Sequence, residues 1–365
     1  ALGGVGGQFD TASVPYYPRQ ISPWIDVLNN GGPGTIYWKQ IGGNGRILVD
    51  GQGGPGGVGR VNGSYPVDTL EVRGALVVTT GLNLGGVKLT SGGILRADNP
   101  RVRLRWPPPP AYGVANIFPS PGGYNSGGSI YPIWVWQDSL RERVTIEVAH
   151  DVFVDATSRL DLTGQGGYGQ DNSSFSSGAY GNRAGGSYGG YGGWGRWSNE
   201  QQMGKPNQVY GDPLKPEEVG EGGYGERNYV NTWHTVTALG GAGGGALRLT
   251  AGGTVQVDGM IVSDGGRGKE DTPAPDGQGT GGGSGGSIWI TAGSLAGSGI
   301  VSASGGDGSF EAYYHQWGGG GGGGRIRIDY DTKSAWNGDV KTFGGRGGQF
   351  DSSHHGLIPW TNPRM

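Results

Sequence analysis

The sequence predicts an all-β protein, a glycine-rich parallel β-helix or solenoid-like stack with long loop insertions and no significant helix. Three observations support this fold class. Short segments alternate apolar and polar residues, clusters of glycine flank them, and the combination of glycine run and strands recurs along the chain. The chain has 365 residues, of which 84 are Gly and 21 are Pro. Its 12 Trp and 17 Tyr argue against a disordered low-complexity chain.

The predicted strands share a period-two alternation that places apolar side chains on one face, and no segment shows a helical period with caps. In chain order, the clearest strands are 46–50, 144–148, 246–250, 254–258, 287–291 and 325–329. Each is short and bounded by glycine, as is typical of strands in all-β proteins.

The strands form a repeated unit of glycine run, strand, turn, second strand and a closing Gly-Gly-x-Gly phrase. Three copies span residues 243–268, 281–308 and 318–347. Earlier, diverged copies close at 53–56 and 166–169. A period of about 40 residues indicates a stacked repeat architecture.

The glycine runs, such as Gly318–Gly324, allow several structures. They can pack as flat layers, line tight corners, or form polyproline-II-like segments packed backbone to backbone, because glycine lacks the Cβ that separates chains. The alternative is a set of flexible linkers. Each run directly precedes a strand, which favours ordered packing.

The predicted organisation separates β-repeat regions from insertions and terminal segments. We expect a terminal repeat or junction segment at 1–30, a β-repeat region at 31–105, a Pro-rich spur and connector at 106–143, a β-repeat at 144–169, a Gly/Ser/Tyr/Trp-rich insertion at 170–235, three glycine-rich β-repeats at 236–350, and a junction tail at 351–365.

The insertion contains a run of aromatic residues separated by glycine pairs. Tyr188, Tyr191 and Trp194 are candidate sugar-stacking residues, because aromatic rings present flat apolar faces. The insertion is either a surface loop with exposed aromatics or an ordered glycine layer in which the aromatics are buried. The first alternative predicts a carbohydrate-binding adhesin module.

The same phrase occurs near both ends of the chain, 341 residues apart. A unit with equivalent ends can add to itself head to tail and grow a filament. We expect the amino-terminal copy to close a unit whose strands a neighbour provides, covalently linked or not. The candidate assembly-junction residues are Gly3, Gly4, Gly7, Gln8, Phe9, Asp10, Gly344, Gly345, Gly348, Gln349, Phe350 and Asp351.

Residues 281–308, followed by 318–330, resemble the glycine-rich repeats of large secreted and cell-surface proteins, and loosely those of mastigoneme-type filament proteins. The resemblance implies an extracellular β-rich fibre or appendage component, often glycosylated. Combined with the terminal phrase, it predicts a structural subunit of an extracellular fibril whose partner is itself, as a homopolymer or as tandem repeats of one chain. Glycans are a further expected partner.

Composition argues against several other classes. The net charge of −3 does not predict a nucleic-acid-binding surface. The absence of Cys excludes disulfides and thiolate metal sites. No run approaches the roughly 18 apolar residues of a membrane span, so we expect no membrane insertion.

No constellation of catalytic residues is present, and we expect no enzymatic activity. Parallel β-helices also occur as polysaccharide-degrading enzymes, but no acid is accompanied by a base in a recognisable pair, so this remains the third alternative.

We expect no cofactor. Calcium is the one metal considered, with Asp171 as a weak candidate because residues 166–171 match the first six positions of a calcium-binding nonapeptide that does not recur here. Asn62 and Asn172 begin N-x-Ser sequons and are candidate glycan attachment sites.

Overall fold

The computed structural model describes residues 33–51, 58–98, 143–169, 183–196, 202–231, 234–268, 279–311 and 316–348. These residues contain strands, turns and extended glycine-rich segments, and no helix. The strand-rich character and the lack of helix in this part of the chain agree with the sequence. None of these residues forms a helix long and apolar enough to cross a membrane.

The larger sheet, sheet A, has nine strands. They are β1 (Ile36–Lys39), β2 (Gly45–Asp50), β4 (Gly63–Arg73), β6 (Leu82–Thr90), β8 (Val144–Val148), β9 (Val152–Val154), β15 (Ala246–Val257), β17 (Ser287–Gly297) and β21 (Arg325–Trp336). β1 is antiparallel to β2, and the other neighbours in this sheet are parallel.

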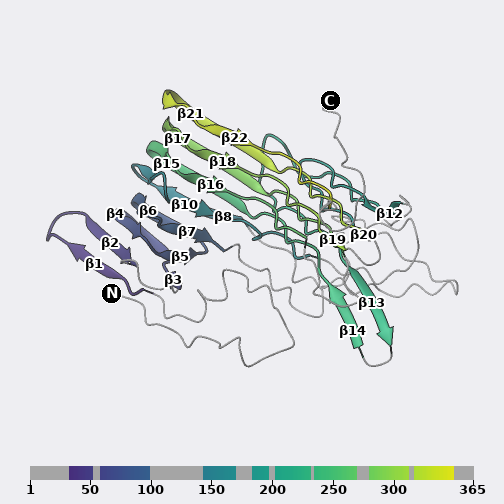
Figure 1. Ribbon diagram of the computed structural model, residues 1–365. Helices are drawn as coiled ribbons and strands as arrows, with labels where there is room; N and C mark the ends of the chain where they lie inside the picture. The colour runs from purple at the N-terminus through teal and green to yellow at the C-terminus, as the bar shows by residue number, and fades with distance from the viewer. Residues whose placement is uncertain are drawn as a thin grey trace, which may run out of the picture.

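The second sheet, sheet B, has seven short strands, all paired in parallel. In spatial order they are β22 (Asp339–Lys341), β18 (Ile300–Ser302), β16 (Met260–Val262), β10 (Arg159–Asp161), β7 (Ile94–Ala97), β5 (Leu76–Thr79) and β3 (Val58–Arg60). Sheet B lies beside sheet A, and the glycine-rich segments extend beyond it on the other side (Figure 1).

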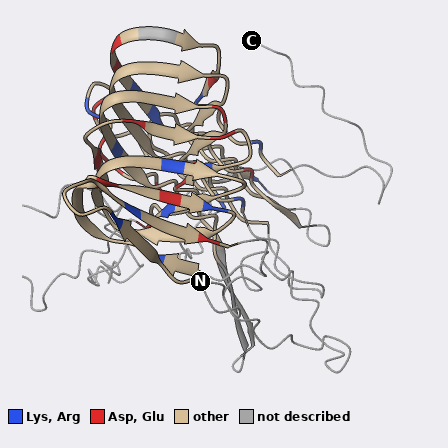
Figure 2. Cartoon of the chain, turned by 90° about the vertical axis from the view of Figure 1, so that its left-hand side faces the viewer, with Lys and Arg blue, Asp and Glu red and all other residues tan. Residues whose placement is uncertain are grey.

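One cluster of buried apolar side chains joins the two sheets. Alternate residues of sheet A, such as Leu247, Leu249 and Ile288, contribute to the same cluster as Ile261 and Val301 of sheet B. The period-two alternation of the sequence produces this core, because alternate side chains of a strand point to one face. Charged residues of both signs are scattered along the strands among uncharged residues (Figure 2).

The remaining described strands form two small antiparallel sheets. One contains β12 (Gln202–Gly204), β11 (Gly195–Arg196), β20 (Gln316–Trp317) and β19 (Phe310–Glu311); the other is the pair β13 (Glu226–Asn231) and β14 (His234–Ala238).

The glycine-rich segments hydrogen-bond to several neighbours at once, with a period of three residues. In residues 281–286, successive N–H groups donate in turn to residues 221–224, 319–322 and 263–266, and each neighbour is contacted again three residues later, at N···O distances of 2.8 to 2.9 Å. Three residues per turn is the repeat of a polyproline II helix, in which backbone groups point outward on three sides. The backbone-to-backbone alternative expected from the sequence accounts for this pattern.

Glycine is required where these segments touch. A Cβ on Gly286 would lie 1.9 Å from the carbonyl oxygen of Gly245, and a Cβ on Gly321 would lie 1.9 Å from that of Gly283. Such approaches are possible only without a side chain. The aligned backbones replace side-chain packing in this part of the molecule.

The expectation of a parallel β-helix or solenoid-like stack is wrong. The sheets are mixed, because β1 pairs antiparallel with β2 in sheet A and the two small sheets are antiparallel, while sheet B is parallel. The short connection at 40–44 makes β1 antiparallel to β2, because a parallel pair needs a longer crossover. In the glycine segments, N–H groups point to three sides and bond to neighbours running in both directions. These segments therefore do not continue the strands as further faces of a coil.

The individual strand predictions agree more closely. Segments 46–50, 144–148, 287–291 and 325–329 lie within β2, β8, β17 and β21. The two strands expected at 246–250 and 254–258 form one strand, β15, whose register with β17 shifts between Ala251 and Thr254.

Candidate assembly surface

The strand order leaves β21 at one end of sheet A and β22 at the same end of sheet B. The glycine segment that follows β22 hydrogen-bonds through Gly345 and Gly348 to the run at 318–321, which precedes β21. We call β21, β22 and residues 342–348 the open end. Among the described residues, no strand pairs with the outer side of β21 or β22.

Side chains at the open end are exposed where their counterparts one strand away are buried. Val301 on β18 is 0% exposed, whereas its partner Val340 on β22 is 49% exposed. Ile288 and Ile290 are fully buried, while their partners Ile326 and Ile328 on β21 are only partly buried. The apolar core therefore reaches the surface at this end.

Phe343 stands where the two preceding repeat copies have a polar residue that hydrogen-bonds to the next copy. The Asp264 carboxylate accepts hydrogen bonds from the Ser304 N–H (2.6 Å) and the Ser302 hydroxyl (2.7 Å), and the Ser304 hydroxyl oxygen accepts one from the Phe343 N–H (3.3 Å). Phe343 occupies the corresponding place in the outermost unit, and 67% of its surface is exposed. An apolar ring thus replaces a polar side chain at the open end.

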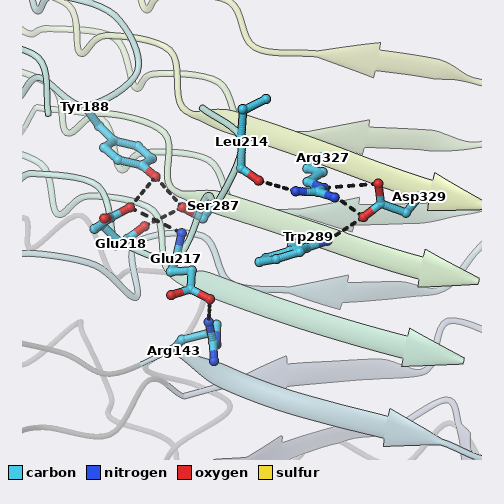
Figure 3. Close-up of polar contacts among 9 residues, drawn as sticks. All are labelled: Arg143, Tyr188, Leu214, Glu217, Glu218, Ser287, Trp289, Arg327 and Asp329. Atoms are coloured by element: carbon cyan, nitrogen blue, oxygen red, sulfur yellow. Dashed lines mark hydrogen bonds and ion pairs between the residues drawn. The ribbon is translucent and has the colours of Figure 1, made fainter. Parts of the chain in front are cut away.

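Charged and aromatic residues cover the outer face of sheet A next to this end (Figure 3). Arg248 and Arg327 each lie 4.6 Å from the ring centroid of Trp289, which is between them in the register. The Arg327 Nε donates to Asp329, and the Trp289 Nε1 donates to Asp329 Oδ2 at 2.8 Å. Hydrogen bonding from Arg327, supported by Trp289, lowers the pKa of Asp329.

Residues 183–196 and 202–224 contact sheet A and the residue before β8 through polar side chains. The Tyr188 hydroxyl lies 3.1 Å from Glu218 Oε2 and 2.7 Å from Ser287 Oγ, at the start of β17 (Figure 3). Arg325 lies over the Tyr188 ring, 5.4 Å from its centroid. Arg143 pairs with Glu217. Burial raises the pKa of Tyr188, so the phenol remains a hydrogen-bond donor.

A buried carboxylate, Glu221, lies among the glycine-rich segments that hydrogen-bond to one another beyond sheet B; we call these segments the glycine-rich region. It accepts hydrogen bonds from the Ser187 N–H (2.8 Å), the Tyr224 hydroxyl (2.6 Å) and the Asn207 amide. Burial raises the pKa of Glu221, although these three donors act in the opposite direction. The contacts join three separate parts of the segment.

The predicted junction residues are only partly described. Gly344, Gly345 and Gly348 lie at the open end, whereas Gly3, Gly4, Gly7, Gln8, Phe9, Asp10, Gln349, Phe350 and Asp351 lie outside the described residues.

The candidate sugar-stacking residues occupy different environments. Tyr188 is completely buried and presents no face to a ligand. Tyr191 and Trp194 are 61% and 38% exposed, and the Tyr191 hydroxyl donates to Gln208 Oε1 at 2.9 Å. The three residues therefore do not form one exposed platform, and sugar binding by the other two stays a prediction.

The remaining candidates concern glycans and calcium. Asn62 is exposed, and its side-chain oxygen accepts hydrogen bonds from the Thr80 N–H (2.8 Å) and the hydroxyl groups of Thr79 and Thr80. Asn172 and Asp171 lie outside the described residues. Within the ranges that the structure describes, no group of three or more His, Asp or Glu residues could hold a metal ion.

Sequence reasoning missed Val340 and Phe343. Alignment of the three glycine-rich copies contains the signal, because Phe343 stands where the other copies have Asp264 and Ser304. That alignment does not reveal which copy lies at the edge, and exposure follows from that position.

Comparisons with protein families, curated proteins and solved structures found no match to this chain.

Proposed function

We propose that this chain is a structural subunit of an extracellular fibril, in which copies join through the open end. The observation that carries the proposal is the exposure of Val340 and Phe343 beside the outer edge of β21, with which no strand of the described residues pairs. A long strand edge with adjacent apolar surface is a template for pairing with another chain. In a soluble monomer such an edge is normally covered or charged.

The repeated terminal phrase supports the same function. It places the same glycine pattern at 3–10 and at 344–351, and residues 344–348 of the second copy belong to the open end. A contact between unlike ends of identical units does not close on itself unless the rotation forms a ring, so it generates a filament. The resemblance to secreted filament proteins supports an extracellular location.

The test is assembly of the purified full chain across a range of concentrations. We expect sedimentation velocity to show polymer above a critical concentration and negative-stain microscopy to show unbranched fibrils of uniform width. A monodisperse particle at all concentrations would contradict the proposed function.

A further inference from the structure

The closing glycine phrases hydrogen-bond to one another in a directional series. Gly265 and Gly268 donate their N–H groups to the carbonyls of Ser304 and Asp307, at 2.8 and 2.7 Å. One unit further along, the N–H groups of Gly305 and Gly308 donate to Phe343 and Arg346, at the same two distances. The next donors in this series are Gly344 and Gly347.

The series stops at the open end. Among the described residues, the N–H groups of Gly344 and Gly347 have no backbone acceptor, and both residues are exposed. Both amides therefore remain available at the edge of the glycine-rich region, in the positions where the two inner phrases each bind the following phrase. Unpaired backbone donors of this kind favour the addition of another chain.

The requirement for glycine also changes at this point. A Cβ on Gly305 or Gly308 would lie 2.0 or 2.2 Å from a carbonyl oxygen of the following glycine run. At Gly344 and Gly347 the nearest described atoms are 3.6 and 3.8 Å away, an ordinary van der Waals distance. Neither has a φ in the left-handed region that favours glycine. Nothing in the described chain therefore requires glycine at these two positions.

Gly345 and Gly348 provide the internal contrast. A Cβ there would lie 2.0 Å from the Gly306 oxygen and 2.2 Å from the Ser309 oxygen. The described fold therefore explains why these two positions are glycine, but it does not explain Gly344 and Gly347. Gly344 and Gly347 occupy the positions at which the inner phrases bind the following phrase, and no described segment follows them there.

We propose that Gly344 and Gly347 form a backbone docking site for a second copy of this chain, which binds through its own phrase at residues 3–7. The sequence of that phrase matches 344–348 in every glycine, so it can act as the next member of the series. In the occupant, Gly4 and Gly7 correspond to Gly345 and Gly348, and Val5 corresponds to Arg346. This inference rests on the proposed function and specifies its contact.

Paired substitutions test the docking site at the open end. Gly344→Ala with Gly347→Ala adds side chains where the described chain has room, so the monomer is expected to fold with an unchanged unfolding midpoint. The methyl groups stand beside the two N–H groups that would bind the docked backbone and hinder its approach, so we expect the critical concentration to rise on the order of tenfold or more, which corresponds to about 1.4 kcal/mol. Arg346→Ala lies between the two glycines and keeps the backbone carbonyl that accepts from Gly308, so it is the matched control and should assemble like the wild type.

Substitutions in the occupant test the other half of the contact. Gly4→Ala with Gly7→Ala should block assembly equally, and Val5→Ala should not. Each double variant retains one intact surface, so mixing the two is expected to give a 1:1 heterodimer by native mass spectrometry, although neither polymerises alone.

The outcomes separate the inference from the function. A wild type that never polymerises contradicts the fibril itself. Wild-type fibrils together with unimpaired assembly of Gly344→Ala/Gly347→Ala overturn only the docking site. If both double variants lose assembly but form no heterodimer on mixing, the docking site is also overturned, because the two intact surfaces then do not bind each other.

Discussion

At the scale of single residues, the glycine-rich region is held by backbone contacts and by a few buried polar side chains. Glu221 is the clearest case, because its carboxylate is surrounded by donors from Ser187, Asn207 and Tyr224 and is not paired with a cation in any described ion pair. Burial of a charged carboxylate is unfavourable, and protonation removes the charge.

The stability of the fold is expected to decrease as pH rises through the raised pKa of Glu221. In the unfolded chain the carboxyl ionises near 4.5, whereas in the folded chain it holds its proton to a higher pH. The stabilising contribution is therefore fully present below the unfolded value and is lost as pH increases through the folded value. Denaturant unfolding across this range should show the loss.

Glu221→Gln is the control for that pH dependence. The amide has a similar shape and does not ionise, so the unfolding free energy of the variant should vary less with pH than that of the wild type. An identical pH profile for the two proteins would show that Glu221 is not responsible.

Gly321→Ala is expected to destabilise the protein by about 1–3 kcal/mol, the usual range for overpacking. The new methyl group would lie 1.9 Å from the Gly283 carbonyl oxygen, so the two backbones must separate. Gly43→Ala, where the nearest atoms are 3.5 Å away, should change the unfolding midpoint far less. Equal midpoints for the two variants would contradict the close backbone packing.

At the scale of elements, β15, β17 and β21 have aligned outer faces as well as a shared core. Arg248, Trp289 and Arg327 are direct neighbours in the register, so the ring stacks between two guanidinium groups. Cation–π contacts at exposed sites contribute about 0.5–1 kcal/mol each. The stack of Arg248, Trp289 and Arg327 helps to hold β21, the last strand at the open end, in register with β17.

Trp289→Phe is expected to raise the pKa of Asp329 toward its ordinary value of 3.8. The phenyl ring preserves an aromatic face for the arginines but removes the N–H that bonds the carboxylate, while the Arg327 contact remains. Because a lowered pKa stabilises the fold above the unfolded value and the effect is lost as pH falls, the variant should lose less stability on acidification. Titration of the Asp329 carboxyl by NMR measures the shift, and an unchanged value would exclude a role for the indole.

The sequence predicted elements better than their arrangement. Local alternation in 287–291 and 325–329 identifies strands β17 and β21, because side-chain direction depends only on the strand itself. The antiparallel position of β1 and the union of 246–250 with 254–258 were missed, since both depend on the neighbouring strand. For the site, the terminal phrase directed attention to Gly344, Gly345 and Gly348, but not to Phe343.

At the scale of the whole molecule, the two sheets and the glycine-rich region end together at the open end. The side chains of Val340 and Phe343 and the N–H groups of Gly344 and Gly347, which have no described backbone acceptor, are therefore exposed on one surface. Burial of apolar area contributes about 25 cal/mol per Å², so covering this end with another chain would stabilise both copies.

Val340→Asp with Phe343→Asp is expected to prevent fibril formation while the monomer remains folded. Val340 is half-exposed and Phe343 is mostly exposed, so substitution at the surface should change stability by about 0.5 kcal/mol or less, whereas burial of two carboxylates in a contact is unfavourable. Critical concentration by sedimentation measures the effect. Met260→Asp, on the inner strand β16, is the control, and equal assembly of the two variants would contradict the role of the open end.

The sequence by itself determined the all-β character of the described chain, the positions of the main strands and the segments in which glycine is concentrated. These properties depend on local alternation and on the absence of a Cβ. Only the tertiary structure decided that the sheets are mixed, that Tyr188 is buried, and that Val340, Phe343, Gly344 and Gly347 lie at an edge with which no described strand pairs. Those facts depend on which segments are neighbours in space. The backbone N–H groups of the glycine segments point to three sides, so they can bond to segments that are distant in the sequence and run in either direction.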